Sequence, residues 1–368
     1  MKELWLEMCN WKINPEKIKL ENVIAFALVS GLIAVFANYG ITYYDPIREM
    51  ESDQVFYRLF YEGEISVGYF EPGYVLLNKL FNFMDLNYVQ FKMVLALLSC
   101  ILIFQRIRGH SINYLFLTVL YIITMYFFDL EQSRNFLAMS IVVYATKFFP
   151  LNRRKDSFKY SIYILLASSI HLSMLFYLSV FLLKNKKIYR ARKVIYVFII
   201  MFCILANRVP SLLTGIGKIL SMLLHSERIG LWFSYRTNGG FFLCLGLYLA
   251  LFFWVGYLKK KVIYKAKMYK KEDVKLIMDA HLMLEVLMLT VPLYLLSTEF
   301  FRLVRGIFVL EFAAILLGIQ LQCQQLRLKS ANIKMFFQKI GLYMYAITFM
   351  CSFPVYVFIV PAILKVFC

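Results

Sequence analysis

Residues 160–183 read YSIYILLASSIHLSMLFYLSVFLL, an apolar run with a polar patch at its centre, 167–173, that contains His171. Basic residues crowd both flanks, and the positive-inside rule places both flanks in the cytoplasm. Because a single crossing cannot begin and end on the same side, the run predicts two short half-helices that meet at a re-entrant turn near His171. One ordinary spanning helix is the alternative, and it would place the lysine-rich segment 259–275 outside.

The chain as a whole has the composition of a membrane protein. Of its 368 residues, 61% are apolar and 17% are charged, which is more apolar surface than a soluble fold can bury. Lipid favours helices, since they satisfy their own backbone polar groups. We predict an all-α, polytopic membrane protein with roughly ten to eleven membrane helices, the broken hairpin included. The other spanning candidates are 22–39, 87–105, 112–128, 132–149, 194–208, 239–258, 276–297, 301–321 and 340–361.

The net charge of +19 comes from basic clusters that lie between apolar runs. Such clusters are typical of cytoplasmic loops near anionic lipid headgroups, so they predict membrane contact and no nucleic-acid partner. No internal repeat is evident, and one polytopic domain over 1–368 is the simplest organisation. The predicted cytoplasmic loops are 150–159, 184–193, 259–275 and 322–339, and the long outer loops are 40–86 and 209–238.

Three arginines lie at the predicted outer boundary, against the positive-inside trend. Arg134 opens helix 132–149, while Arg302 and Arg305 open helix 301–321, three residues apart and so on one helical face. Guanidinium groups pair with phosphate oxygens and keep their charge, so the three arginines predict an anion site. Pairing with the neighbouring Glu131 and Glu299 is the alternative.

His171 and Glu71 are the candidate proton acceptors. An imidazole in a re-entrant turn could take a proton from a hydroxyl near neutral pH, and a purely structural histidine is the alternative. Glu71 and Pro72 precede a short apolar run, 74–84, that predicts a short helix at the outer face. The Glu71 carboxylate is therefore a helix cap, a base, or a group that orders a sugar or an arginine.

Further acidic residues lie within the predicted spans. Asp279 is near an inner end and is expected to pair with a lysine; Glu285 and Glu311 are deeper and would pair with His281 or an arginine, or mark ion coupling. The sequence contains no Walker motif, no zinc-type spacing and no Gly-rich dinucleotide loop. We therefore predict no cofactor and no metal.

Several blocks, in their order and spacing, resemble the EpsG/Wzy-type polysaccharide polymerases over residues 40–183. They read Tyr43-Tyr44-Asp45, Glu71-Pro72-Gly73-Tyr74-Val75-Leu76-Leu77-Asn78, Gln132-Ser133-Arg134-Asn135-Phe136-Leu137-Ala138 and Ala167-Ser168-Ser169-Ile170-His171-Leu172-Ser173. The late Glu299-Phe300-Phe301-Arg302 agrees with the same pattern. The third block departs from it after the arginine, where Asn135 stands in place of a residue such as Gln or Gly, but the arginine itself is present.

The resemblance implies a GT-C-like membrane glycosyltransferase of the bacterial cytoplasmic (inner) membrane, with its site facing the outside or the periplasm. Such enzymes join oligosaccharide repeat units, carried on undecaprenyl pyrophosphate, into O-antigen, capsule or exopolysaccharide. Donor and acceptor are both lipid-linked, membrane lipid surrounds the chain, and a chain-length regulator is a further class of partner.

The same resemblance implies roles for the candidate residues. Arg134, Arg302 and Arg305 would neutralise the pyrophosphate. His171 or Glu71 would accept the proton of the sugar hydroxyl. Further residues expected at the sugar or the phosphates are Tyr74, Asp45, Arg236 and Glu299.

Two other functions remain open from the sequence. Glu285 and Glu311, within spans, suit a transporter or flippase of lipid-linked oligosaccharides, although transporters usually show internal repeats. A membrane O-acyltransferase acting on sugars would also use a histidine within the membrane.

Overall fold

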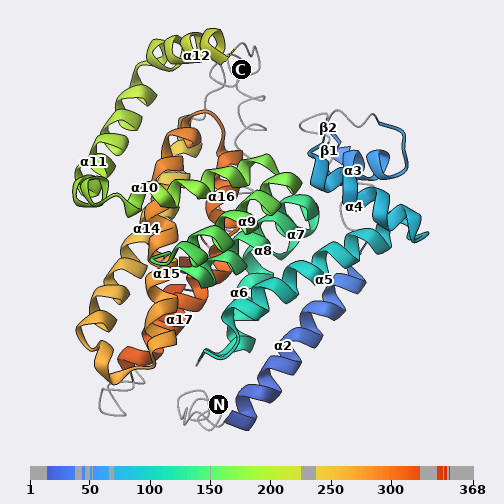
Figure 1. Cartoon of the computed structure of the whole chain (residues 1–368), viewed down its shortest axis with the longest axis horizontal. Coiled ribbons are helices and arrows are strands. Elements are labelled where there is room, and N and C mark those ends of the chain that lie inside the picture. The colour runs from blue at the N-terminus through green and yellow to red at the C-terminus, as the bar shows by residue number, and fades with distance from the viewer. Residues whose placement is uncertain are drawn as a thin grey trace.

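The computed structural model describes residues 15–37, 44–45, 50–51, 53–65, 70–110, 112–149, 151–224, 238–323, 338–342, 344–345 and 348. Almost all of these residues are helical, which confirms the all-α part of the predicted fold class (Figure 1). The strands among them are the antiparallel two-residue pair β1 (Tyr44–Asp45) and β2 (Met50–Glu51).

The first half of the chain places short elements ahead of a helical bundle. In Figure 1 the strands, α3 and α4 gather at the upper right, beside the start of α5. Asn87 caps α5 through a reciprocal pair of bonds with Gln90, each 2.9 Å long. The helices are α2 (Pro15–Val35), α3 (Asp53–Tyr61), α4 (Pro72–Phe83), α5 (Tyr88–Ile107), α6 (Tyr114–Thr124), α7 (Tyr126–Glu131), α8 (Ser133–Ala145) and η2 (Thr146–Phe148).

The second half contains the hairpin and several broken helices. The elements are α9 (Arg154–Ile170), η3 (Leu172–Ser179), α10 (Val180–Lys184), α11 (Lys186–Arg208), α12 (Pro210–Leu224), α14 (Asn238–Tyr264), η4 (Ala266–Met268), α15 (Lys271–Leu287), η5 (Met288–Leu295), η6 (Thr298–Phe301), α16 (Arg302–Arg305) and α17 (Phe308–Cys323). In Figure 1, α11 and α12 lie at the upper left, away from α3 and α4.

Several described helices have the length and hydropathy of membrane spans. Tyr88–Ile107, Gly240–Tyr264 and Lys271–Leu295 are each long and apolar enough to cross a bilayer. Lys186–Arg208 and Ser211–Ile219 would make a fourth span if this pair, bent by 109°, crosses as one unit. Shorter apolar helices are Val23–Val35, Tyr114–Thr124, Leu172–Lys184 and Phe308–Gln322. The larger number of ten to eleven spans stays a prediction, and most of candidate 340–361 lies outside the described residues.

The chain turns back on itself at His171, as the polar patch predicts. Helix α9 ends at Ile170, His171 has an extended backbone, and η3 returns along α9. The Tyr160 hydroxyl donates to the Tyr177 carbonyl at 3.0 Å, and Lys184 Nζ donates to Ser157 Oγ at 2.8 Å. Both ends of the run therefore lie side by side, which excludes one continuous helix over 160–183.

Several predicted boundaries are wrong. The run 112–128 is split at Met125 into α6 and α7. The helix predicted at 301–321 is broken between α16 and α17. Helices also extend into three of the predicted loops: within 184–193 only Asn185 lies between α10 and α11, α12 occupies the start of 209–238, and α14 continues into 259–275. The side of the membrane on which these segments lie stays a prediction. Hydropathy locates apolar runs but does not show where a polar helix end continues past the lipid boundary.

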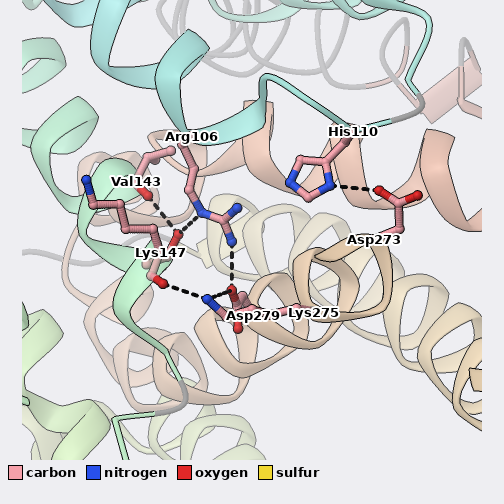
Figure 2. Close-up of polar contacts among 8 residues, drawn as sticks. Arg106, His110, Val143, Lys147, Asp273, Lys275 and Asp279 are labelled. Carbon is pink, nitrogen blue, oxygen red and sulfur yellow. Dashed lines mark hydrogen bonds and ion pairs between the residues drawn. The ribbon is translucent and has the colours of Figure 1, made fainter. Parts of the chain in front are cut away.

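Arg106, at the end of α5, holds three elements together through its guanidinium group. Its Nε donates to Thr146 Oγ1 at 2.7 Å and its Nη2 to Asp279 Oδ2 at 2.7 Å, so α5, η2 and α15 are joined (Figure 2). Lys275 Nζ donates to the Lys147 carbonyl at 2.6 Å. Asp279 forms an ion pair with Lys275 at 3.9 Å, as predicted, and has a shorter contact with Arg106 at 2.7 Å, which was not predicted. We call Arg106, Thr146 and Asp279 the Arg106 cluster.

The other predicted acidic residues behave differently from each other. Glu285 pairs with Arg192 at 3.2 Å and with His281 at 3.6 Å, as predicted. Glu311 is fully buried, and neither of its carboxyl oxygens has a hydrogen-bond partner among the described residues. His110 pairs with Asp273 at 2.8 Å, next to the Arg106 cluster (Figure 2).

Candidate functional site

The segment that begins at Glu71 packs tightly against the end of α9. Glu71 is the N-cap residue of α4 with φ −67° and ψ 149°, and Pro72 follows in the first turn, where its missing N–H leaves no bond unmade. A Cβ at Gly73 would lie 2.7 Å from the Ser169 carbonyl oxygen and would also clash with the Ser169 Oγ. Glycine at this position therefore allows the start of α4 to touch the hairpin.

The Glu71 side chain links the hairpin to α8. Its Oε1 accepts a hydrogen bond from the Leu172 N–H at 2.8 Å, and its Oε2 forms an ion pair with Arg134 Nη1. Glu71 occupies the N-cap position of α4, as predicted, but its side chain makes no capping bond to that helix. The structure instead supports the reading of Glu71 as a carboxylate that orders an arginine, and it joins three of the sequence blocks.

Arg134 is surrounded by aromatic rings. Its Cζ lies 5.1 Å from the ring centre of Phe70, 5.5 Å from that of Tyr57 and 5.7 Å from that of Tyr74. Ring faces attract a cation and shield it from water. Among the described residues, the Arg134 Nε is buried without a hydrogen-bond partner. Arg134 therefore pairs with Glu71, not with Glu131, and keeps an unused donor.

His171 lies at the apex of the hairpin, within electrostatic range of two arginines. Its Nδ1 pairs with Ser173 Oγ at 2.9 Å, and its ring is largely buried. The charges of Arg134 and Arg302 both act on it. Burial first, and the two arginine charges second, disfavour the imidazolium form, so the His171 ring is neutral.

The two late arginines meet different neighbours. Arg302 acts electrostatically on His171 and Tyr57, so it belongs to the same site. Arg305 Nη2 instead donates to Gln132 Oε1 at 2.6 Å, and its Cζ lies 4.7 Å from the ring centre of Phe128. The structure therefore brings Arg302 to Glu71, Arg134 and His171, while Arg305 holds the residue before α8.

The remaining predicted residues have mixed outcomes. Tyr74 is fully buried in contact with Phe70 and Tyr57, so it offers no ring face to a sugar. Asp45 lies in β1, but its side chain, like that of Glu299, is outside what the structure describes, and so is the whole of Arg236.

Sequence reasoning missed Tyr57 and Phe70, which line the arginine, and Gln54, which lies behind it. Burial raises the pKa of the Tyr57 phenol well above its ordinary value, with a further contribution from Asp53, so this hydroxyl stays protonated. The aromatic density of the predicted outer loop 40–86 was the available signal for Tyr57 and Phe70. We name Glu71, Arg134, His171 and the rings of Tyr57, Phe70 and Tyr74 the Glu71 site.

The residues brought together at the Glu71 site are those that carry the sequence resemblance. A family model described as the EpsG family matches residues 23–364, nearly the whole chain. The chain belongs to the EpsG family. Membership confirms the resemblance and indicates a glycosyltransferase-like polysaccharide polymerase with transmembrane character. No curated protein and no solved structure matches the chain.

The site of this EpsG-family chain combines a fixed cation with a proton acceptor. Arg134 supplies charge and an unpaired N–H, Arg302 adds a second charge nearby, and His171 supplies an imidazole. A fixed cation stabilises a leaving group that gains negative charge, and an imidazole can deprotonate an attacking hydroxyl. This is the set of groups that transfer from a phosphate-linked donor requires.

Proposed function

We propose that this protein is a membrane glycosyltransferase that polymerises undecaprenyl-pyrophosphate-linked oligosaccharide repeat units at the outer face of the bacterial cytoplasmic membrane. The observation that carries the proposal is the Glu71 carboxylate, which joins Arg134 to the apex of the hairpin beside His171. It gathers a cation and a base around one point, although the two come from segments far apart in the chain.

The reaction forms one bond and breaks another at the anomeric carbon of the donor sugar. A hydroxyl oxygen of the acceptor repeat unit attacks that carbon, and the bond from the carbon to the pyrophosphate oxygen breaks. The electron pair leaves with the lipid pyrophosphate, whose developing charge Arg134 and Arg302 stabilise. The hydroxyl proton passes to His171.

The contacts of Glu71 favour His171 as the base. One Glu71 oxygen is paired with a guanidinium and the other accepts a backbone N–H, so both oxygens already have partners within the protein. The imidazole Nδ1 faces Ser173, which leaves Nε2 for the acceptor hydroxyl. Glu71 thus orients Arg134 and the hairpin.

The hairpin itself suits a site that takes lipid-linked substrates. Irregular backbone at membrane depth needs protein or water to satisfy it, and the Leu172 N–H at the turn is satisfied by Glu71. A re-entrant turn brings a base to the level of lipid headgroups, where a pyrophosphate lies. The GT-C-like architecture and the outward orientation of the Glu71 site are part of this proposal.

Replacement of Arg134 by alanine tests the proposal in cells. We expect Arg134→Ala to abolish long-chain polymer while the protein still inserts, with single lipid-linked repeat units accumulating. Arg153→Ala is the matched control, because Arg153 is highly exposed and pairs only with its neighbour Asp156 in the described structure. Long-chain polymer at the wild-type level in Arg134→Ala would overturn the assignment.

The location of the accumulated units separates this function from transport. An inactive polymerase leaves the lipid-linked units on the outer face of the membrane, whereas an inactive flippase leaves them on the cytoplasmic face. An O-acyltransferase defect would leave chain length unchanged and remove an acyl group from the product. Accumulation inside, or loss of acyl groups alone, would reject the polymerase.

A further inference from the structure

Gln54 is a fully buried polar residue of α3 whose amide is satisfied on both sides. Its Nε2 donates to the Glu131 carbonyl at 2.6 Å and to Ser133 Oγ at 3.1 Å. Its Oε1 accepts from the Tyr88 hydroxyl at 2.6 Å. A buried amide that uses both its donor and its acceptor groups fixes the relative positions of the segments it joins, here α3, α5 and the start of α8.

These bonds meet the chain on both sides of the break that precedes Arg134. Helix α7 ends at Glu131, Gln132 has φ −112° and ψ 53°, and α8 begins at Ser133. A helix end leaves carbonyl groups without helical partners, and Gln54 satisfies the one at Glu131. Arg134 is the next residue after Ser133, so the position of its Cα depends on this junction.

The same helix supplies part of the aromatic lining of Arg134. Tyr57 is three residues after Gln54 on α3 and therefore close to the same helix face, and its ring lies 5.5 Å from Arg134 Cζ. Gln54 thus fixes both the backbone that carries Arg134 and the helix that lines its guanidinium group.

We infer that Gln54 is the positioning residue for Arg134: it holds the break between α7 and α8 and the ring of Tyr57 in the arrangement that aims the guanidinium at the pyrophosphate. Gln54 touches no substrate and acts only through Arg134. The inference rests on the proposed function, in which Arg134 stabilises the leaving group. Displacement of a catalytic group by about 1 Å lowers turnover on the order of 100-fold.

Gln54→Met tests this role, since methionine has a similar shape but forms none of the three bonds. With purified protein and lipid-linked repeat units, we expect kcat to fall about 10- to 100-fold and KM to change little. Tyr88→Phe removes the bond to Gln54 Oε1 but keeps the two bonds that Gln54 Nε2 donates, so it should lower kcat less and provides a milder variant if Gln54→Met folds poorly.

Asn82→Leu is the matched control. Asn82 Nδ2 also anchors α3, because it donates to the Tyr61 carbonyl at 2.9 Å, but in the described structure it makes no bond to the junction that precedes Arg134.

A double variant separates positioning from general stability. In an Arg134→Lys background with residual activity, Gln54→Met should lower kcat by less than threefold, because the residue through which it acts is already changed. Equal fold losses in both backgrounds, or an equal loss in Asn82→Leu, would overturn the inference.

Hydrogen exchange distinguishes failure of this inference from failure of the proposed function. Gln54→Met should speed amide exchange at residues 131–136 whatever reaction the protein catalyses. If exchange is faster in Gln54→Met but Arg134→Ala makes normal polymer, then Gln54 positions Arg134 but Arg134 does not act in polymerisation. If exchange is unchanged in Gln54→Met and Arg134→Ala is inactive, then the role of Arg134 stands and the positioning role of Gln54 is rejected.

Discussion

Two of the arginine–carboxylate pairs among the described residues, Arg106–Asp279 and Arg134–Glu71, lie near opposite ends of α8 and differ in how completely their guanidinium groups are hydrogen-bonded. In the Arg106 cluster the side chains of Arg106 and Asp279 are 5% and 4% exposed, and in the Glu71 site those of Arg134 and Glu71 are 15% and 20% exposed. Arg134 lies at the start of α8 and Thr146, the partner of Arg106, directly follows its end, so with about 1.5 Å of rise per residue the two are roughly 18 Å apart along the helix axis.

The difference lies in the guanidinium nitrogens. The Nε of Arg106 donates to Thr146, whereas the Nε of Arg134 has no partner among the described residues. A buried, fully bonded pair holds helices together, and an incompletely bonded, partly exposed pair can accept a ligand. We therefore propose that the Arg106 cluster is structural and that the Glu71 site binds the substrate, and the variants below test that distinction.

The largest expected effect is at His171. We expect His171→Ala to lower turnover on the order of 100- to 10,000-fold, because the acceptor hydroxyl loses its base. His110→Ala is the matched histidine variant beside the Arg106 cluster, where the pair with Asp273 is structural. Turnover per folded molecule should stay near wild type in His110→Ala, and equal losses in the two variants would remove the distinction between the regions.

The next effect is on stability, at Asp279. Asp279→Ala leaves Arg106 buried without its carboxylate, which should lower the free energy of unfolding by about 3–5 kcal/mol. The double variant Arg106→Met/Asp279→Leu removes both charges and should recover most of that loss. Thermal unfolding of the purified protein measures both, and a double variant as unstable as Asp279→Ala would show that the pair is more than a structural contact.

The smallest effect is expected at Gly73. In Gly73→Ala the new Cβ clashes with the Ser169 backbone, so α4 must shift away from the hairpin. We expect this shift to lower the free energy of unfolding by about 1–3 kcal/mol. Turnover should fall as well, since Glu71 moves with α4. The control Gly31→Ala adds a Cβ with no neighbour within 4 Å among the described atoms and should change neither quantity. Unchanged turnover in Gly73→Ala would separate α4 from the site.

The sequence predicted the parts of the fold that charge and hydropathy determine. The all-helical class, the helix at 74–84 and the turn at His171 follow from apolar runs, Pro72 and the basic flanks, and the structure bears them out. The breaks at Met125 and after Arg305 were missed, because no proline or polar patch marks them. Tertiary contacts decide such breaks, for example the close approach of Gly306 to Met139.

The candidate site was predicted in its charged members but not in its arrangement. Glu71, Arg134, His171 and Arg302 stood out as ionisable groups near predicted membrane boundaries. Their pairing could not be predicted, because the bond from Glu71 to the Leu172 N–H joins residues 101 positions apart. Gln54 was missed because a neutral amide in a short amphipathic helix resembles any surface residue until its burial is known.

The most direct test of the account compares one substitution at the two ends of the bundle. Arg134→Lys and Arg106→Lys both keep the charge and remove the fork of guanidinium donors. With lipid-pyrophosphate-linked repeat units and purified protein, we measure glycosidic bonds formed and lipid pyrophosphate released per folded molecule. We predict a large loss of both, in equal amounts, in Arg134→Lys and wild-type values in Arg106→Lys. Wild-type bond formation in Arg134→Lys, or the same loss in both variants, would contradict the account.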